Sequence, residues 1–256
     1  MKSSPSLRIG ELSFTNTVPF RLPAQWNPIP CPSPRLLAAW AEDDRIDAGV
    51  LPVVEAWRLE DRFDVLGPYG IAVKRKAGSV LLFSKRPWKD LEGATVGVTD
   101  QTSTSVKLLK VLLEAREGFS VQLREGFHPS DESRLVIGDD ALAPQEDLIK
   151  TFPHVTDLAE KWSQWHGGPF VFARWMVRRN TPPYLRDELA EALETALDQF
   201  AKNNIHRSRQ SAQFLKIPTA QMTNYFNGFV YRLGPQEERA ESLFRDQVTG
   251  RKRMYC

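Results

Sequence analysis

The segment Arg8-Ile-Gly-Glu-Leu-Ser-Phe-Thr-Asn-Thr-Val-Pro-Phe20 carries the clearest structural signal in this chain. Its apolar residues Ile9, Leu12 and Phe14 predict a short buried strand, and three polar residues follow directly. A strand that runs into a polar cluster is typical of an open α/β sheet, in which ligands bind beyond the carboxyl ends of the strands. Asn16 in this cluster can donate and accept hydrogen bonds without carrying charge, which suits a small oxygen-rich ligand. A capped turn that binds nothing would give the same pattern, so both interpretations stay open.

The composition argues against a nucleic-acid-binding protein. The chain has 256 residues, enough for one large or two small domains, and its 34 Lys and Arg against 32 Asp and Glu leave a net charge of +2. Nucleic-acid binders usually carry a basic domain or stripe. The basic runs at 74–76 and 251–253 are too short for that and are expected to be solvated. We therefore expect no nucleic-acid partner.

Patterns for metals, disulfides, nucleotides and membranes are missing from the sequence. The two cysteines, Cys31 and Cys256, give neither a disulfide framework nor a metal-ligand spacing, and the four histidines are scattered. No glycine-rich phosphate-binding motif follows a strand, so we expect no metal and no cofactor. The N-terminus lacks an apolar signal region, and no apolar run approaches the roughly 20 residues that span a bilayer. These observations predict a cytoplasmic protein that does not enter the membrane.

Strands and helices are expected to alternate along the chain, which predicts an α/β fold. The expected strands lie at 46–51, 63–66, 70–73, 79–84, 94–98, 121–123, 135–137 and 170–172, and the expected helices at 34–40, 52–57, 106–113 and 181–200. Beyond them, the chain to about residue 248 is expected to be helical, with a break at Gly234-Pro235. We place crossings between two domains at Pro87 and at Thr181-Pro182.

The turn Thr102-Ser-Thr-Ser105 is the best candidate for a binding site. It lies between the strand at 94–98 and a helix, so hydroxyl groups and free backbone N–H groups would meet there. Such a turn can hold the carboxylate of a ligand without a lysine. Plain N-capping of the helix by Ser and Thr is the alternative. Asp139 and Asp140, which follow another strand, are likewise either ligand contacts or N-caps.

Several segments, taken in chain order, resemble the chorismate dehydratase family of the futalosine route to menaquinone. They are Arg8-Ile-Gly with Phe14-Thr-Asn-x-x-Pro-Phe20, Ser79-Val-Leu-Leu-Phe-Ser-Lys85, Thr104-Ser-Val-Lys-Leu-Leu109, Val136-Ile-Gly-Asp-Asp-Ala-Leu142, and Asp157-Leu with Trp162 and Gly167-Gly-Pro-Phe-Val-Phe-Ala-Arg-Trp175. Tyr225 and Tyr231-Arg-Leu-Gly234 resemble its C-terminal segment. Each motif is modest alone, but their common order covers nearly the whole chain.

The resemblance implies a type II periplasmic-binding-protein-like fold, in which two α/β lobes enclose a ligand cleft. Chain order then implies a discontinuous first lobe of residues 1–86 and 183–256 and a second lobe of residues 87–182. The implied partner is a small dicarboxylate, chorismate. The oligomeric state cannot be predicted from these features.

The family's reaction is the dehydration of chorismate to 3-[(1-carboxyvinyl)oxy]benzoate, which makes its members carbon–oxygen lyases. By resemblance, Asn16 and Ser79 form the catalytic pair, and Thr104 and Ser105 would bind a substrate carboxylate. Neither Asn16 nor Ser79 is a convincing strong base, so a carboxylate of the substrate itself is hypothesised to accept the ring proton. Three further residues in the matched segments are expected to contact the substrate: Gly138, Asp139 and Phe170.

Two other functions are compatible with the same fold. The sister 1,4-dihydroxy-6-naphthoate synthase carries Asp in the first motif and His where this chain has Gly138, so Asn16 and Gly138 argue against it. A non-catalytic protein that binds small carboxylates is the second alternative. The chain also departs from the dehydratase pattern in ways that bear on substrate and rate, at Pro52, Arg75-Lys-Ala-Gly78, His166 and Gly168.

Overall fold

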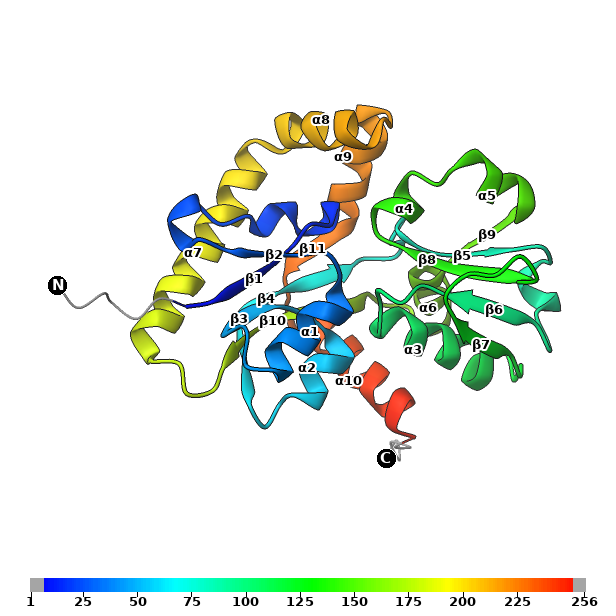
Figure 1. The fold of residues 1–256 in the computed structure, drawn as a ribbon, viewed down its shortest axis with the longest axis horizontal. Helices are drawn as coiled ribbons and strands as arrows, with labels where there is room; N and C mark the ends of the chain where they lie inside the picture. Colours follow the sequence, from blue (N-terminus) through cyan, green and yellow to red (C-terminus); the bar gives the residue numbers. More distant parts are fainter. Residues whose placement is uncertain (1–6, 251–256) are drawn as a thin grey trace.

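A computed structural model describes residues 7–250, which form two α/β units side by side (Figure 1). The first unit has a six-stranded sheet in the order β11-β4-β10-β3-β1-β2, and the second has a five-stranded sheet in the order β7-β6-β8-β5-β9. The α/β fold class predicted from the alternating elements is confirmed. The basic run at 251–253 and Cys256 lie outside the described residues.

The first sheet places the carboxyl end of its central parallel strand beside the second unit. β1 pairs in parallel with β2 and β3, whereas β10 lies antiparallel between β3 and β4, and β11 is an edge strand beside β4. β11 falls within the part of the chain that was expected to be helical. The strands are β1 (Ile9–Leu12), β2 (Ile29–Cys31), β3 (Ala48–Pro52), β4 (Phe63–Val73), β10 (Phe170–Arg178) and β11 (Phe229–Arg232).

The second sheet is built around the apolar strand β5. β5 lies antiparallel between β8 and β9, while β6 lies parallel between β7 and β8. Its Leu82 and Phe83 are both buried, as a strand covered on both faces requires. The strands are β5 (Val80–Ser84), β6 (Thr95–Val98), β7 (Gln122–Glu125), β8 (Ser133–Ile137) and β9 (His154–Asp157).

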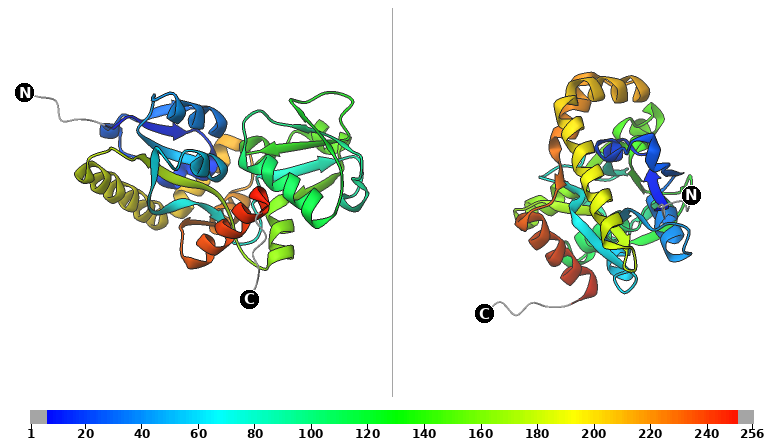
Figure 2. Two further views of the ribbon diagram at one scale, coloured as in Figure 1. Left: turned by 90° about the horizontal axis from the view of Figure 1, so that it is seen from below. Right: turned by 90° about the vertical axis from the view of Figure 1, so that its left-hand side faces the viewer.

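Helices cover the faces of both sheets (Figure 2). The first unit carries α1 (Pro34–Glu42), α2 (Val53–Arg58), α7 (Pro183–Lys202), α8 (Asn204–Leu215), α9 (Thr219–Gly228) and α10 (Pro235–Thr249). The second carries α3 (Thr104–Lys110), which continues into a π-helical turn (Val111–Arg116), α4 (Asp139–Leu142), α5 (Glu146–Thr151) and α6 (Leu158–His166). Short 3₁₀ turns occupy Thr15–Phe20, Ala24–Trp26 and Trp88–Asp90. Within residues 7–250, none of the helices combines the length and the apolar character needed to cross a membrane.

The sheets divide the chain differently from the expected crossings at Pro87 and Thr181-Pro182. β5 already belongs to the second sheet, so the first crossing lies between β4 and β5. β10 belongs to the first sheet, so the chain returns between α6 and β10. An apolar run predicts that a strand is buried, but it does not tell in which of two sheets the strand pairs. The two crossing segments are 74–79, which follows β4, and 167–169, which precedes β10. They lie side by side where they meet the first sheet, because Val73 at the end of β4 pairs with Phe170 at the start of β10.

The C-terminal helix α10 packs where the chain returns from the second unit to the first (Figure 2). Phe244 on α10 contacts Trp162 on α6 at 5.7 Å between ring centroids and Phe170 on β10 at 4.8 Å. Trp162 and Phe170 pack edge to face at 5.3 Å. These three buried aromatic side chains therefore form a core that joins the two units.

Candidate active site

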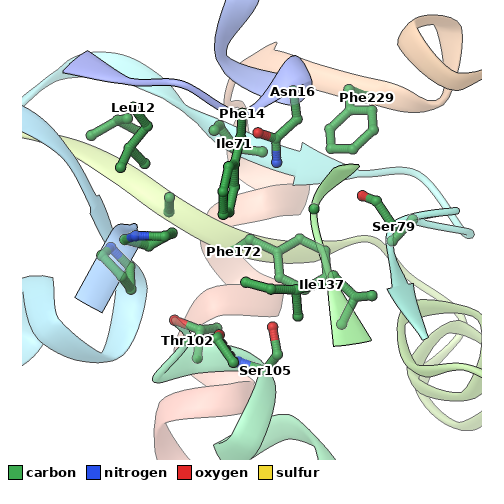
Figure 3. A pocket seen from close by; sticks show the side chains of 18 residues that line it. Leu12, Phe14, Asn16, Ile71, Ser79, Thr102, Ser105, Ile137, Phe172 and Phe229 are labelled. Atoms are coloured by element: carbon green, nitrogen blue, oxygen red, sulfur yellow. Dashed lines mark hydrogen bonds between the residues drawn. The ribbon is translucent and has the colours of Figure 1, made fainter. Parts of the chain in front are cut away.

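A cavity lies where the two units meet, and side chains from both units line it (Figure 3). Its empty space, counted together with the open solvent at its mouth, is about 580 Å³. The lining residues are Leu12, Phe14, Asn16, Pro34, Val50, Pro52, Ile71, Ala77, Ser79, Val80, Thr102, Thr104, Ser105, Ile137, Gly138, Phe172, Ala173 and Phe229. No lining residue carries an ionisable side chain. The polar groups of the wall are therefore hydroxyls, one side-chain amide and backbone atoms.

Asn16 lies in the 3₁₀ turn that follows β1, and its side chain points into the cavity (Figure 3). Its neighbour Thr17 stabilises the strand end, since Thr17 Oγ1 donates to Leu12 O at 2.8 Å and to Phe14 O at 2.7 Å. The Oδ1 atom of Asn16 is buried and has no hydrogen-bond partner among residues 7–250. The Thr17 hydroxyl is thus occupied by main-chain carbonyl oxygens, and Asn16 Oδ1 remains available to a ligand.

Ser79 lies at the end of the first crossing segment, directly before β5. Its carbonyl oxygen accepts a hydrogen bond from Gly138 N at 2.9 Å. Its hydroxyl oxygen lies 2.9 Å from Tyr225 Oη. The preceding segment is held by the buried Asp157 carboxylate, which accepts from Ala77 N at 3.2 Å and from Gly78 N at 2.6 Å. Ser79 therefore has a fixed main chain on the cavity wall.

The turn at 102–105 forms the opposite side of the cavity (Figure 3). Thr102 Oγ1 accepts from Ser105 N at 3.3 Å, so Thr102 provides the local cap of the helix. The hydroxyl of Thr104 is buried without a partner among the described residues. In this turn, as in the turn after β1, one hydroxyl is occupied by the main chain and a neighbouring buried polar atom has no partner among residues 7–250. Thr104 and Ser105 line the cavity as predicted residues of a carboxylate site, and that role stays a prediction.

Gly138 and Asp139 connect the two units at the edge of the cavity. Gly138 has φ +65°, and a Cβ atom there would lie 3.1–3.3 Å from the ring of Phe14 in the other unit. Asp139 is not among the lining residues. Instead, its Oδ1 accepts from Thr15 N at 3.0 Å across the cleft. Burial raises the pKa of the Asp139 carboxyl, while the hydrogen bond from Thr15 opposes this shift.

Phe170 does not reach the cavity, which differs from the expected substrate contact. Its side chain is 1% exposed and packs in the aromatic core with Trp162 and Phe244. The pairing of β10 with β4 shifts register between Val171 and Ala173. Phe172 and Ala173 line the cavity in its place.

Some of the residues that depart from the family pattern line the cavity, and others do not. Pro52 and Ala77 line it. His166 is not among the lining residues, and its ring packs against Trp162 and Trp165 at 4.2 and 4.1 Å between ring centroids. Burial lowers the pKa of His166. Gly168 also lies outside the lining.

Sequence reasoning missed the apolar walls and one polar partner. Phe14 was assigned to the buried strand, yet it lines the cavity beside Asn16. Phe229 and Ile137 contribute further apolar wall. Tyr225 had been noted only as part of a C-terminal motif, and its contact with Ser79 joins residues 146 positions apart, which no local pattern predicts. Among the described residues, no group of three or more His, Cys, Asp or Glu side chains is placed to hold a metal ion.

A sequence model for menaquinone biosynthesis matches residues 7–249. This chain belongs to the menaquinone-biosynthesis family. This chain is similar to a chorismate dehydratase of Thermus thermophilus. The two sequences are 31% identical over 195 residues, which cover 68% of this chain and 69% of the relative. The family resemblance deduced from the ordered motifs is confirmed.

Solved structures establish the fold of this family member. A protein of Archaeoglobus fulgidus superposes with a TM-score of 0.77 at 14% identity, covering 97% of this chain and 98% of the other. The alkanesulfonate-binding protein of Xanthomonas axonopodis bound to MOPS superposes with a TM-score of 0.62 at 14% identity, covering 99% and 96%. The periplasmic aliphatic sulphonate binding protein of Escherichia coli gives 0.59 at 13% identity, covering 96% and 86%. The chain therefore has the periplasmic-binding-protein-like fold, as predicted.

Proposed function

We propose that this protein is a chorismate dehydratase that converts chorismate to 3-[(1-carboxyvinyl)oxy]benzoate and water. The observation that carries the proposal is the cavity wall, which offers an amide, several hydroxyls and no ionisable side chain. The 31% identical chorismate dehydratase supplies independent support. The reaction must therefore be one that needs orientation and hydrogen bonds more than a protein acid or base.

The dehydration has this property. The ring carbon that bears the ether loses a proton, the electrons of that C–H bond form a ring double bond, and the neighbouring C–O bond breaks. The hydroxyl leaves with a proton as water, and the ring becomes aromatic. Aromatisation supplies a large driving force, so the protein has to position a dianion and stabilise the charge that develops.

The neutral wall suggests how the roles are divided. No lining side chain is a base at neutral pH, so we assign the proton acceptor to a carboxylate of the substrate itself. Asn16, with its unpartnered Oδ1, and Ser79 would contact the reacting part of the ring. Thr104 and Ser105, across the cavity, would hold a carboxylate. Hydrogen bonds from neutral groups are strengthened in such an enclosed site.

Two alternative functions can be distinguished from the proposed dehydratase. A histidine at position 138, as in the sister synthase, would have to displace the Phe14 ring, because even a Cβ atom lies within 3.3 Å of it. A binding protein without catalysis fits the fold, since structural neighbours of this chain are sulfonate-binding proteins. Such a protein would bind chorismate and leave it unchanged.

The test is to incubate the purified protein with chorismate and to follow the aromatic product by liquid chromatography and mass spectrometry. We expect Asn16→Ala to lower kcat by about 100-fold or more, the usual effect of removing one preorganised polar contact. Its circular dichroism and unfolding midpoint should match the wild type. Asn227→Ala is the matched control, because that exposed amide lies outside the cavity and bonds Asn204.

Normal turnover by Asn16→Ala would refute the role of Asn16. Binding of chorismate by the wild type without any product would favour the non-catalytic protein.

A further inference from the structure

A buried hydrogen bond behind the cavity wall joins Ser79 to Tyr225. Tyr225 Oη lies 2.9 Å from Ser79 Oγ, and the two residues are 7% and 2% exposed. Ser79 lines the cavity, whereas Tyr225, on α9, is not among the lining residues. The hydroxyl of Tyr225 can therefore act on a ligand only through Ser79, whereas its ring also packs against the lining residue Phe229 at 4.8 Å between ring centroids.

The surroundings decide which oxygen donates. Among residues 7–250, Ser79 Oγ is the one hydrogen-bond partner of Tyr225 Oη. If Ser79 donated, the phenol hydrogen would be buried without an acceptor, which costs the full desolvation of that group. A phenol is also the stronger acid of the two hydroxyls and hence the better donor. Burial raises the pKa of Tyr225, so its hydrogen is retained at neutral pH. Tyr225 therefore donates to Ser79.

Hydrogen bonds of the main chain also fix the position of Ser79. Asp157 holds Ala77 N and Gly78 N, and Gly138 N donates to Ser79 O at 2.9 Å. With its backbone fixed and one lone pair occupied by Tyr225, the serine can direct its own O–H toward the cavity that it lines (Figure 3). The serine then acts as a donor on that side.

We propose that Tyr225 is a positioning residue that makes Ser79 a hydrogen-bond donor toward the ligand. The ligand atom that meets Ser79 must then be an acceptor, such as a carboxylate or hydroxyl oxygen. In the dehydration of chorismate, and here the inference rests on the proposed function, such a donor stabilises charge on an oxygen of the reacting molecule.

A double-mutant cycle tests the proposal with the wild type, Ser79→Ala, Tyr225→Phe and the double variant. We expect Tyr225→Phe to lower kcat/KM for chorismate about tenfold, which corresponds to one hydrogen bond. In the Ser79→Ala background the same change should have no effect, because Tyr225 acts through that hydroxyl. Additive losses in the cycle would overturn the proposal.

Tyr231→Phe is the matched control. Tyr231 Oη is also buried, but it has no hydrogen-bond partner among the described residues, and its ring stacks on Phe229, which Tyr225 contacts as well. We expect Tyr231→Phe to keep the wild-type kcat/KM. An equal loss in both phenylalanine variants would assign the effect to packing and would overturn the proposal.

Failure of the proposed function gives a different result. If the wild type binds chorismate without turnover, the same cycle is measured on the chorismate Kd by calorimetry, and coupling there supports the role of Tyr225. If chorismate does not bind, the cycle is measured on the urea unfolding midpoint, where additive shifts would refute the hydrogen bond itself. Turnover with additive losses rejects the role of Tyr225 alone.

Discussion

Gly138 occupies a backbone conformation that other residues adopt only with strain. Its φ is +65°, and it lies on the cavity wall against Phe14. With ψ −142° it lies outside the left-handed α region, in a region that is almost exclusive to glycine, so we expect Gly138→Ala to lower stability by about 1–3 kcal/mol from backbone strain alone. The new methyl group would also press on the Phe14 ring, so kcat/KM for chorismate should fall at least severalfold. Urea unfolding and steady-state kinetics measure the two effects.

Gly167 offers the control for this change. Its φ is +71°, similar to that of Gly138, but a Cβ atom there would meet nothing within 4 Å, and the residue lies outside the cavity lining. Because Gly167 has ψ 14°, in the left-handed α region, whereas Gly138 has ψ −142°, Gly167→Ala should lose less stability than Gly138→Ala and keep its activity. Full activity in Gly138→Ala would show that the Phe14 contact does not matter for turnover.

Single polar residues were the hardest to assign from sequence. From sequence, the polar cluster after β1 fitted either a cap or a ligand contact. In the structure the Thr17 hydroxyl bonds main-chain carbonyl oxygens, and Asn16 Oδ1 has no partner among the described residues. The turn at 102–105 divides in the same way between Thr102 and Thr104. Neighbouring residues of similar chemistry point to different sides of the chain, and that direction depends on backbone geometry that the sequence does not reveal.

Helix α6 begins at a residue that also holds the first crossing segment. Asp157 Oδ1 caps the helix by accepting from Ala159 N and Glu160 N at 3.0 and 3.1 Å, and Oδ2 accepts from Gly78 N at 2.6 Å. In Asp157→Asn, an amide NH₂ would replace one of these acceptors. We expect a loss of about 1–3 kcal/mol, as for a buried donor without a partner.

The contact between Asp157 and Gly78 N should also affect catalytic activity. Gly78 directly precedes Ser79, so kcat/KM for chorismate should fall in Asp157→Asn together with stability. Glu237→Gln is the control, because Glu237 Oε2 also accepts a backbone N–H at a helix start, that of Gly234 at 2.9 Å, but neither residue lines the cavity. A loss of activity in the control, or none in Asp157→Asn, would contradict this assignment.

Elements were predictable where periodicity was strong and local. The helical stripe from Leu185 to Phe200 became α7, with its apolar side buried. The apolar runs at β5 and β10 were recognised as strands, but both pair in the other sheet from the one expected. β11 has four residues at a sheet edge and was hidden in a helical region. Pairing partners are chosen by contacts distant in sequence, which single-chain patterns do not contain.

The two units contact each other on more than one side of the cleft. Asp139 accepts from Thr15 N at 3.0 Å, Arg35 N donates to Gln101 O at 3.1 Å, and the Arg35 side chain pairs with Glu125 at the surface. The exposed ion pair is worth little. The partly buried Asp139 contact is therefore the more informative one to change.

Asp139 predicts a pH-dependent stability. Burial raises its pKa in the folded state, so the carboxylate form is disfavoured there, and its contribution to stability is lost as the pH rises through the folded pKa. Asp139→Asn keeps an acceptor for Thr15 N and removes the charge. We expect it to raise the urea unfolding midpoint at pH 8 and to lose this advantage at pH 4.

Asp140→Asn serves as the comparison, since Asp140 is exposed beside it. The difference between its unfolding midpoint and that of the wild type should change much less between the two pH values. A lower midpoint for Asp139→Asn at pH 8 would mean that the charged carboxylate strengthens the contact with Thr15 more than burial weakens it.

The arrangement of the whole molecule was accessible from sequence only through family resemblance. Alternation predicted an α/β protein, but the two-unit fold followed from the ordered motifs, and the structural neighbours confirm it. The resemblance also pointed to Asn16, Ser79, Thr104, Ser105 and Gly138, which the structure brings to one cavity. It could not reveal the contact between Ser79 and Tyr225, because that bond depends on how α9 packs against the first crossing segment.

The two crossing segments differ in their relation to the cavity, and this difference decides where the chain can be cut or extended. In the first crossing segment Ala77 and Ser79 also form cavity wall, whereas Gly167 and Gly168 in the second lie outside the lining, with nothing within 4 Å of where a Cβ atom would lie. New termini, reporter insertions or lobe exchanges between relatives are therefore best joined at 167–168. A splice at 77–79 would interrupt the cavity wall at Ala77 and Ser79, so this chain has one junction outside the cavity and one within its wall.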